Sequence, residues 1–169
     1  MLKKFSLVLC TLMATIFSGG WLFGSDYLGI SPQKFMNAYN SKLEYAARQI
    51  NASNYNNYKI LSMERNNDGY YVYNLASRSQ GYSLSAEAKD DKLKQVMIMS
   101  PKLEDVVMII GAAGYACPEI SKLSDLNSKI SDVSLRAIKN GSAELKDGDI
   151  HMMAVYQRGV FIFKFMYVD

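Results

Sequence analysis

Apolar side chains near the start of the chain recur at helical spacing. Those that follow Pro32 at steps of three and four residues are Phe35, Tyr39, Leu43, Ala46 and Ile50. Residues at this spacing share one face of a helix. Ser31 suits the capping position and Pro32 the first helical position, where its missing N–H and fixed φ cost nothing. The pattern predicts a helix from Pro32 that covers a core and ends in the loop 51–57, rich in asparagine.

From Tyr58 the pattern changes to an alternation with a period of two, which is typical of half-buried strands. Four strands are expected, over residues 58–63, 70–76, 82–88 and 93–99. Asn67-Asp68-Gly69 is a hairpin signal between the first two, and the charged residues 89–92 form a turn between the last two. Together they predict an antiparallel meander.

After Pro101 the period returns to that of a helix. A strongly apolar helix is expected from Leu103 to Tyr115, and it should end near Cys117-Pro118 because the residue before proline avoids helical geometry. A second helix should run from about Ser121 to Asn140, with Gly141 as its stop.

The chain closes with two strands, predicted over residues 149–156 and 160–168. The last one is apolar at nearly every position, which is typical of a central strand covered on both faces. The expected fold class is α+β, with a single antiparallel sheet of about six strands and three helices packed mainly on one face. The order of elements is α-β-β-β-β-α-α-β-β, in a single domain over residues 25–169.

The first residues carry the features of a secretory signal. Lys3 and Lys4 precede an uncharged apolar run, and small residues follow at Ser18, Gly19 and Gly20. This order predicts a signal peptide over residues 1–20 and a periplasmic or secreted domain. The alternative is an uncleaved anchor to about residue 24, because the uncharged run is close to the ~20 residues that span a bilayer. The domain would then sit outside the cytoplasm on the inner membrane.

Charge and cysteine content exclude several classes of protein. Of 19 basic residues, Lys3 and Lys4 lie in the leader, which leaves 17 against 16 acidic ones. Nucleic acid is therefore no expected partner, because a phosphate-binding surface needs clustered basic side chains. Beyond the leader the chain has one cysteine, Cys117, and one histidine, His151, so neither an internal disulfide nor a metal site is expected.

Catalytic chemistry has few candidates in this sequence. Cys117 and His151 are formally available as a nucleophile and its base, but no third orienting group is visible. The neighbours Glu104 and Asp105 fall in the first turn of a predicted helix, where negative charge is favoured without any catalytic role. We expect no catalytic residue and no cofactor.

Tyrosine is unusually abundant in the first half of the predicted sheet. Amphipathic rings are enriched at binding surfaces, and alternating strands place them on both faces of a sheet. The predicted partner-binding residues are Tyr55, Tyr58, Tyr70, Tyr71, Tyr73 and Tyr82. The methionines on the strands add a weaker indication, because flexible thioethers suit adaptable interfaces.

Residues Ser31-Pro32-Gln33-Lys34-Phe35-Met36-Asn37-Ala38-Tyr39-Asn40 form a short recognisable motif. It resembles the Ser/Thr-Pro-x-x-Phe-x-x-x-Phe/Tyr-Asn opening helix of small exported bacterial proteins and lipoproteins of unknown function. The resemblance implies a meander, a helical pair around a proline and a final hairpin, and it brings no catalytic residues.

These observations predict an exported, non-enzymatic protein-binding module of the bacterial envelope, of which an inhibitor or immunity-type protein is one version. One alternative is a membrane-anchored subunit of an envelope or surface assembly, with membrane contact only through an uncleaved leader. The other is a cysteine-dependent enzyme that uses Cys117 and His151.

Overall fold

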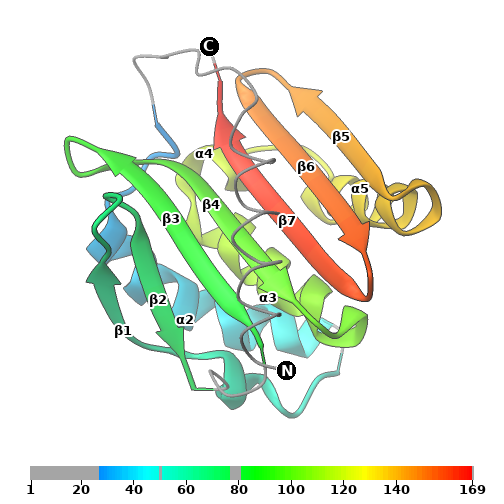
Figure 1. Ribbon diagram of the computed structural model, residues 1–169, viewed down its shortest axis with the longest axis horizontal. Coiled ribbons are helices and arrows are strands. Elements are labelled where there is room, and N and C mark those ends of the chain that lie inside the picture. Colours follow the sequence, from blue (N-terminus) through cyan, green and yellow to red (C-terminus); the bar gives the residue numbers. More distant parts are fainter. Residues whose placement is uncertain (1–26, 50, 77–80, 169) are drawn as a thin grey trace.

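All strands in the described part of the chain lie in one antiparallel sheet (Figure 1). The computed structural model describes residues 27–49, 51–76 and 81–168. The strands are β1 (Ile60–Arg65), β2 (Tyr71–Leu75), β3 (Ser83–Lys89), β4 (Lys92–Ser100), β5 (Ser142–Asp147), β6 (Ile150–Gln157) and β7 (Val160–Tyr167). Their spatial order is β1-β2-β3-β4-β7-β6-β5, so two meanders join where β4 pairs with β7. The predicted first meander is confirmed.

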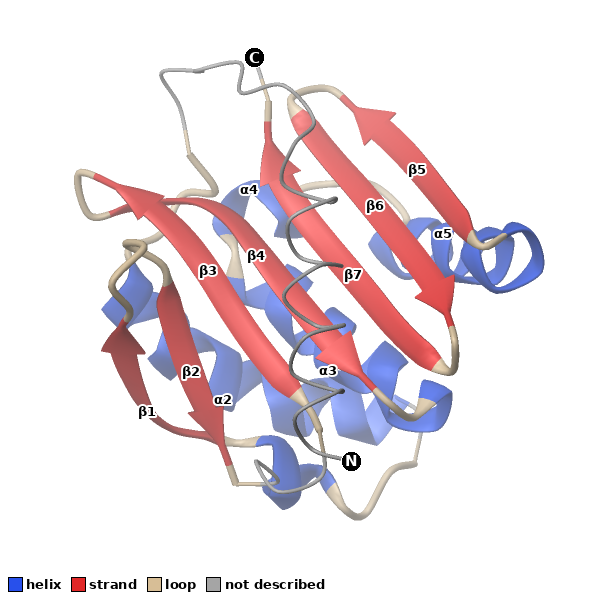
Figure 2. Cartoon of the chain, in the orientation of Figure 1, coloured by secondary structure: helices blue, strands red, loops and turns tan. Residues whose placement is uncertain are grey.

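The helices pack together on one side of this sheet (Figure 2). They are α2 (Pro32–Gln49), α3 (Leu103–Ala116), α4 (Pro118–Ser121) and α5 (Leu126–Asn140), with a 3-10 turn η1 (Tyr55–Tyr58) before β1. The α+β class and the single antiparallel sheet are thus confirmed. The described part of the chain has seven strands and four helices, however, so the prediction of six strands and three helices was wrong.

The missing strand is β5, which the sequence analysis left as a connection. Only Ala143 and Leu145 are apolar in it, and its side chains alternate between exposed and half-buried because it is an edge strand. The helix predicted over residues 121–140 is in fact divided. Asp125 has a positive φ of 53° at the break, and Gly141 ends α5 in the left-handed conformation, as expected.

The main core lies between the sheet and the helices. Its largest contributors on β7 are Phe161, Phe163 and Phe165, all fully or nearly fully buried. Helix α3 approaches this row through Gly114, where an added Cβ would lie 3.3 Å from the ring of Phe165. Close helix packing thus accounts for this glycine.

Asn40, the last residue of the opening motif, joins α2 to the edge strand β1. Its Nδ2 donates to the carbonyl oxygen of Ile60 at 2.9 Å, and its Oδ1 accepts from the Ile60 N–H at 2.8 Å. The side-chain amide thereby satisfies both backbone groups of Ile60, as a neighbouring strand would. Nearby, the Tyr39 hydroxyl donates to the carbonyl oxygen of Tyr58. The motif therefore holds α2 against the first strand.

We expect Asn40→Ala to lower the free energy of unfolding by about 2 kcal/mol, because it leaves two part-buried backbone groups without their partner. Asn37→Ala, an exposed position on the same helix, serves as the matched control and should change stability by less than about 0.5 kcal/mol. Urea unfolding measures both variants. Equal stability of the two variants would contradict this role of Asn40.

Candidate interaction face of the sheet

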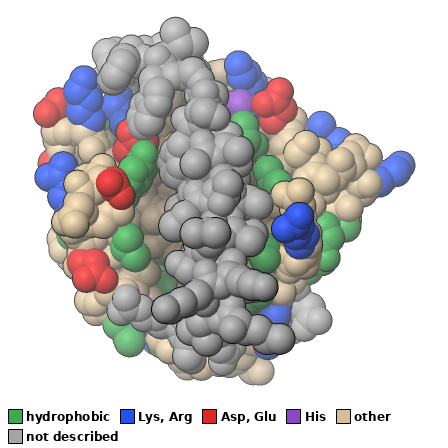
Figure 3. Space-filling model, in the orientation of Figure 1, with side chains coloured by type: hydrophobic (Ala, Val, Ile, Leu, Met, Phe, Trp, Pro, Cys, Tyr) green, Lys and Arg blue, Asp and Glu red, His purple; other side chains and the backbone are tan. Residues whose placement is uncertain are grey.

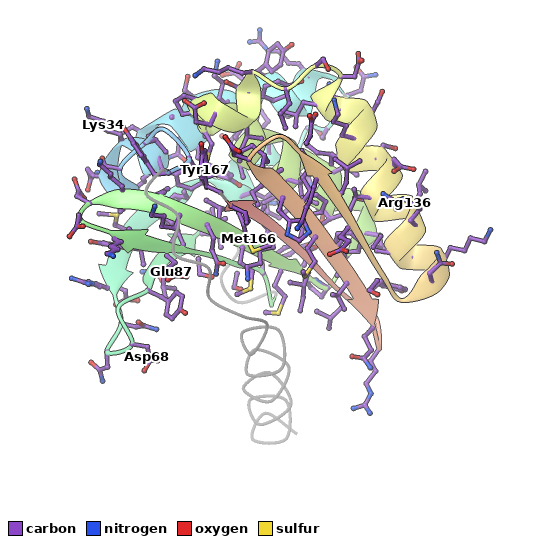
Figure 4. All side chains as sticks on the ribbon, turned by 90° about the horizontal axis from the view of Figure 1, so that it is seen from above. Lys34, Asp68, Glu87, Arg136, Met166 and Tyr167 are labelled. Atoms are coloured by element: carbon purple, nitrogen blue, oxygen red, sulfur yellow. The ribbon has the colours of Figure 1, made fainter. Side chains whose placement is uncertain are left out.

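One face of the sheet points away from all four helices, and we call it the open face. In Figure 4 the helices lie above the sheet, and Glu87 and Met166 project from its lower side. Side chains alternate between the two faces of a strand, so on β7 the three core phenylalanines leave Ile162 and Lys164 on the open face. The strand pairing puts Met99 opposite Ile162 and Met97 opposite Lys164.

The centre of the open face is an apolar cluster separate from the main core. Its members, which we call the apolar strip, are Met97, Met99, Val155, Val160 and Ile162. Met97, Ile162 and Met99 are only 4%, 6% and 7% exposed. Figure 3 views this side of the molecule, where hydrophobic side chains lie beside acidic and basic ones. The open face thus combines apolar and charged side chains.

Two side chains of opposite charge, the buried Lys164 and the half-buried Glu87, interact beside the apolar strip. Burial lowers the pKa of Lys164, and the nearby Glu87 carboxylate only partly offsets this. Burial likewise raises the pKa of Glu87, and the Lys164 charge opposes the rise. Each group therefore stabilises the charge of the other at a site where desolvation opposes both. The sequence signal for this pair is Lys164, a single charged residue inside the apolar run of β7. The sequence analysis drew no site from this lysine.

His151 lies on the open face, since its neighbours Ile150 and Met152 point into the main core. Its Nε2 is 3.1 Å from Oε2 of Glu144 on β5. Cys117 belongs to the main core on the helix side and is fully buried, which raises the pKa of its thiol well above the ordinary value. The structure therefore separates Cys117 from His151 by the sheet. The pairing on which the cysteine-enzyme alternative depended is absent from the described residues.

Three of the six predicted partner-binding tyrosines belong to the main core. Tyr58, Tyr73 and Tyr82 are nearly fully buried, and their rings pack between the sheet and the helices. The Tyr73 hydroxyl donates to the carbonyl oxygen of Pro32 at 3.1 Å. The expectation that these three offer contact surface is therefore wrong. The sequence analysis expected tyrosines on both faces of the sheet. Tyr73 lies on the face that the helices cover.

The other three tyrosines are half-buried and reach the surface. Tyr71 lies under the guanidinium group of Arg65, 5.7 Å from the ring centre, and Tyr55 has the Lys59 ammonium group at 5.6 Å. Tyr70 alternates with Tyr71 and so lies on the side of the open face. Burial raises its pKa, and so does the charge of Glu87. Tyr70 is thus the predicted tyrosine that borders the candidate face.

Asp105, in the first turn of α3, collects three hydrogen bonds on the helix side of the molecule. Its Oδ2 accepts from the hydroxyls of Tyr58 at 2.5 Å and Tyr82 at 2.7 Å, and its Oδ1 accepts from Nδ2 of Asn54 at 3.2 Å. Burial acts to raise the pKa of Asp105. The hydrogen bonds and the charge of Lys102 outweigh burial, so the pKa lies below its usual value. This cluster ties α3 to η1 and to Tyr82, the residue before β3, and it explains why two of the tyrosines are buried.

Within residues 27–49, 51–76 and 81–168 no group of three or more histidine, cysteine, aspartate or glutamate side chains is placed to hold a metal ion. None of the helices in this described part is long and apolar enough to cross a membrane. The predicted signal peptide lies outside the described residues. Comparison of the chain with protein-family models, with curated proteins and with solved structures finds no match.

Proposed function

We propose that this chain is an exported, non-enzymatic protein-binding module of a bacterial envelope, and that it contacts its protein partner through the open face. The observation that carries the proposal is the apolar strip, which lies on the side of the sheet opposite to all described helices. An inhibitor or immunity-type protein, which occludes a toxin or hydrolase outside the cytoplasm, is the narrower version.

The composition of the open face supports a protein partner. Its centre carries Met97 and Met99, and flexible thioethers adapt to the shape of a bound surface. The open face also carries polar and charged side chains, among them the half-buried Glu87 and the largely buried His151. Apolar side chains give an interface affinity, and polar ones fix the orientation of the partner.

The two edges of the sheet are less suited to a partner. On β1 the side chain of Asn40 holds both backbone groups of Ile60. On β5 the guanidinium group of Arg136 donates to the carbonyl oxygen of Glu144 at 3.1 Å. Side chains that occupy edge groups hinder pairing with another strand. We therefore place the contact on the open face.

The rival proposal is a membrane-anchored subunit of an envelope or surface assembly. It is favoured by the uncharged run of residues 5–23, which approaches the length that spans a bilayer. The same open face would then bind a neighbouring subunit. The intact mass of the natively expressed protein separates the two proposals, because a chain that starts near Trp21 has lost this run.

We expect Ser85→Arg to weaken capture of the partner by about tenfold, the effect of about 1.4 kcal/mol. Ser85 is half-buried and pairs with Met97 across β3 and β4, so a long charged side chain there would extend over the apolar strip. The measurement is crosslinked pull-down from the cell fraction that holds the protein, with each captured protein quantified against wild type.

Ser131→Arg is the matched control, because Ser131 is exposed on α5 at the other side of the sheet. It should leave capture unchanged. A partner that both variants capture as well as wild type does not bind through the open face, and that result would contradict the proposal.

A further inference from the structure

The outer edge of β5 presents backbone groups that β6 does not use. Hydrogen-bonded and non-bonded residue pairs alternate between two antiparallel strands. The Tyr156 N–H donates to the carbonyl oxygen of Gly141, so Gly141 belongs to a bonded pair with β6. Every second residue from Gly141 onward is bonded to β6 in the same way. The N–H and C=O groups of Ser142, Glu144 and Lys146 therefore point outward, away from the sheet.

One side chain of α5 occupies this edge. Nη2 of Arg136 donates to the carbonyl oxygen of Glu144 at 3.1 Å, and its Nε donates to Oδ2 of Asp132 at 2.9 Å. Figure 4 labels Arg136, which reaches from α5 to β5. In the described part of the chain, no other side chain bonds to the outward backbone groups of β5. Because a side chain on an edge hinders the addition of another strand, Arg136 blocks this edge.

The exposed edge of β5 is complementary in charge to a second copy of itself. When two β5 strands pair antiparallel about a two-fold axis at Leu145, Glu144 lies opposite Lys146 of the second copy, and Lys146 lies opposite its Glu144. Opposite charges directly across two strands stabilise their pairing, and like charges destabilise it. A register centred on Glu144 would place two carboxylates opposite each other. Charge therefore selects the register centred on Leu145.

The helices fit such a pair of chains. Helix α5 packs beneath both β5 and β6, so it lies about half a strand spacing inward from β5. With strands about 4.8 Å apart, the two α5 helices would lie about 10 Å apart, a distance at which helices pack. Leu145 points to the helix side and packs against the main core, so the two Leu145 side chains would meet at the axis. The pair thus continues both the sheet and the helix layer.

We infer that β5 is a self-pairing edge whose partner is a second copy of this chain, in the register that sets Glu144 opposite Lys146, and that Arg136 keeps this edge blocked. When the guanidinium group releases the Glu144 carbonyl oxygen, that oxygen accepts from the Lys146 N–H of the second copy. Because the two-fold pair uses the β5 edge of both chains, association stops at two chains. The open face takes no part in this pairing, so the inference does not depend on the proposed function.

Sedimentation equilibrium of the full chain, purified from the cell fraction that holds it, measures the dissociation constant of the dimer. We expect Arg136→Ala to lower this constant by at least about tenfold, the equivalent of about 1.4 kcal/mol. Arg48→Ala is the matched control, because Arg48 is an exposed arginine on α2 that pairs with Glu44 as Arg136 pairs with Asp132. It should leave the constant unchanged. If Arg136→Ala associates no more tightly than Arg48→Ala, the inference is overturned.

Charge reversal tests the register. In the Arg136→Ala protein, the added change Lys146→Glu places glutamates opposite each other at two positions, and the dissociation constant should rise by about tenfold or more. A further change, Glu144→Lys, restores opposite charges and should restore the dimer. Association that ignores these changes, or that continues beyond two chains, would overturn the inference. Urea unfolding of each variant checks that the fold is intact. The pull-down with Ser85→Arg reads out the open face separately, so the two proposals can fail independently.

Discussion

Phe163→Ala is expected to lower the free energy of unfolding by about 3–5 kcal/mol, the largest effect that we predict. Phe163 lies in the middle of β7, which pairs with β4 where the two meanders join, and it is fully buried. Its ring is 5.0 Å from that of Phe165 and 6.4 Å from that of Phe161. Truncation would remove the centre of this row and leave a cavity under α3.

Urea unfolding, with the slope and midpoint fitted for each variant, measures this loss. Leu135→Ala is the control, because Leu135 is 63% exposed on α5 and its truncation should cost less than about 0.5 kcal/mol. A loss below about 1 kcal/mol for Phe163→Ala would mean that the helices do not pack on this face of the sheet.

The elements that the sequence predicted well are those with strong local signals. Gly69 takes a positive φ in the β1–β2 hairpin, and Gly141 does so at the end of α5. Pro118 ends α3 at Cys117, as a proline forces the residue before it out of helical geometry. These residues act through their own backbone, so their effect can be seen without knowledge of the tertiary fold.

The elements that sequence analysis missed depend on distant contacts. Strand β5 has only two apolar residues and is held by pairing with β6 and by packing of α5 beneath it. The break between α4 and α5 occurs at Asp125, a residue that usually tolerates a positive φ better than most. Neither feature has a hydrophobic period that would reveal it. The sequence analysis therefore treated β5 as a connection and residues 121–140 as one continuous helix.

The same limit applies to the candidate interaction face. Alternation in Tyr70-Tyr71-Val72-Tyr73 predicts that the rings divide between two faces, but the side that the helices occupy is decided by residues about thirty positions away in either direction. The apolar strip is likewise assembled from β4, β6 and β7, which pair across some seventy residues. Sequence pattern gives the face of each strand, and only the topology brings those faces together.

Asp105→Asn is expected to lower the free energy of unfolding at neutral pH by about 2 kcal/mol, because it weakens the charged hydrogen bonds to Tyr58 and Tyr82. The size of this effect should depend on pH. Despite burial, which opposes the charge, the hydrogen bonds and Lys102 keep the folded pKa of Asp105 below its usual value. The aspartate of the unfolded chain titrates at about 3.9. Folding therefore favours the charged form of Asp105. The contribution of this carboxylate to the free energy of unfolding is fully present above the pKa of the unfolded chain.

As the pH falls through the lowered folded pKa, the wild-type protein should lose this stabilisation, while Asp105→Asn should not. The difference in unfolding free energy between the two proteins is thus constant from about pH 7 to pH 5 and shrinks below about pH 4. Urea unfolding at several pH values measures this difference. Asp132→Asn is the control, because Asp132 is exposed and paired with Arg136, and its unfolding free energy should differ from that of the wild-type protein by less than about 0.5 kcal/mol.

The double variant Tyr82→Phe with Asp105→Asn completes the test. If the two changes add fully, the hydroxyl and the carboxylate do not act together, and the role assigned to the cluster in holding α3 to Tyr82 is wrong.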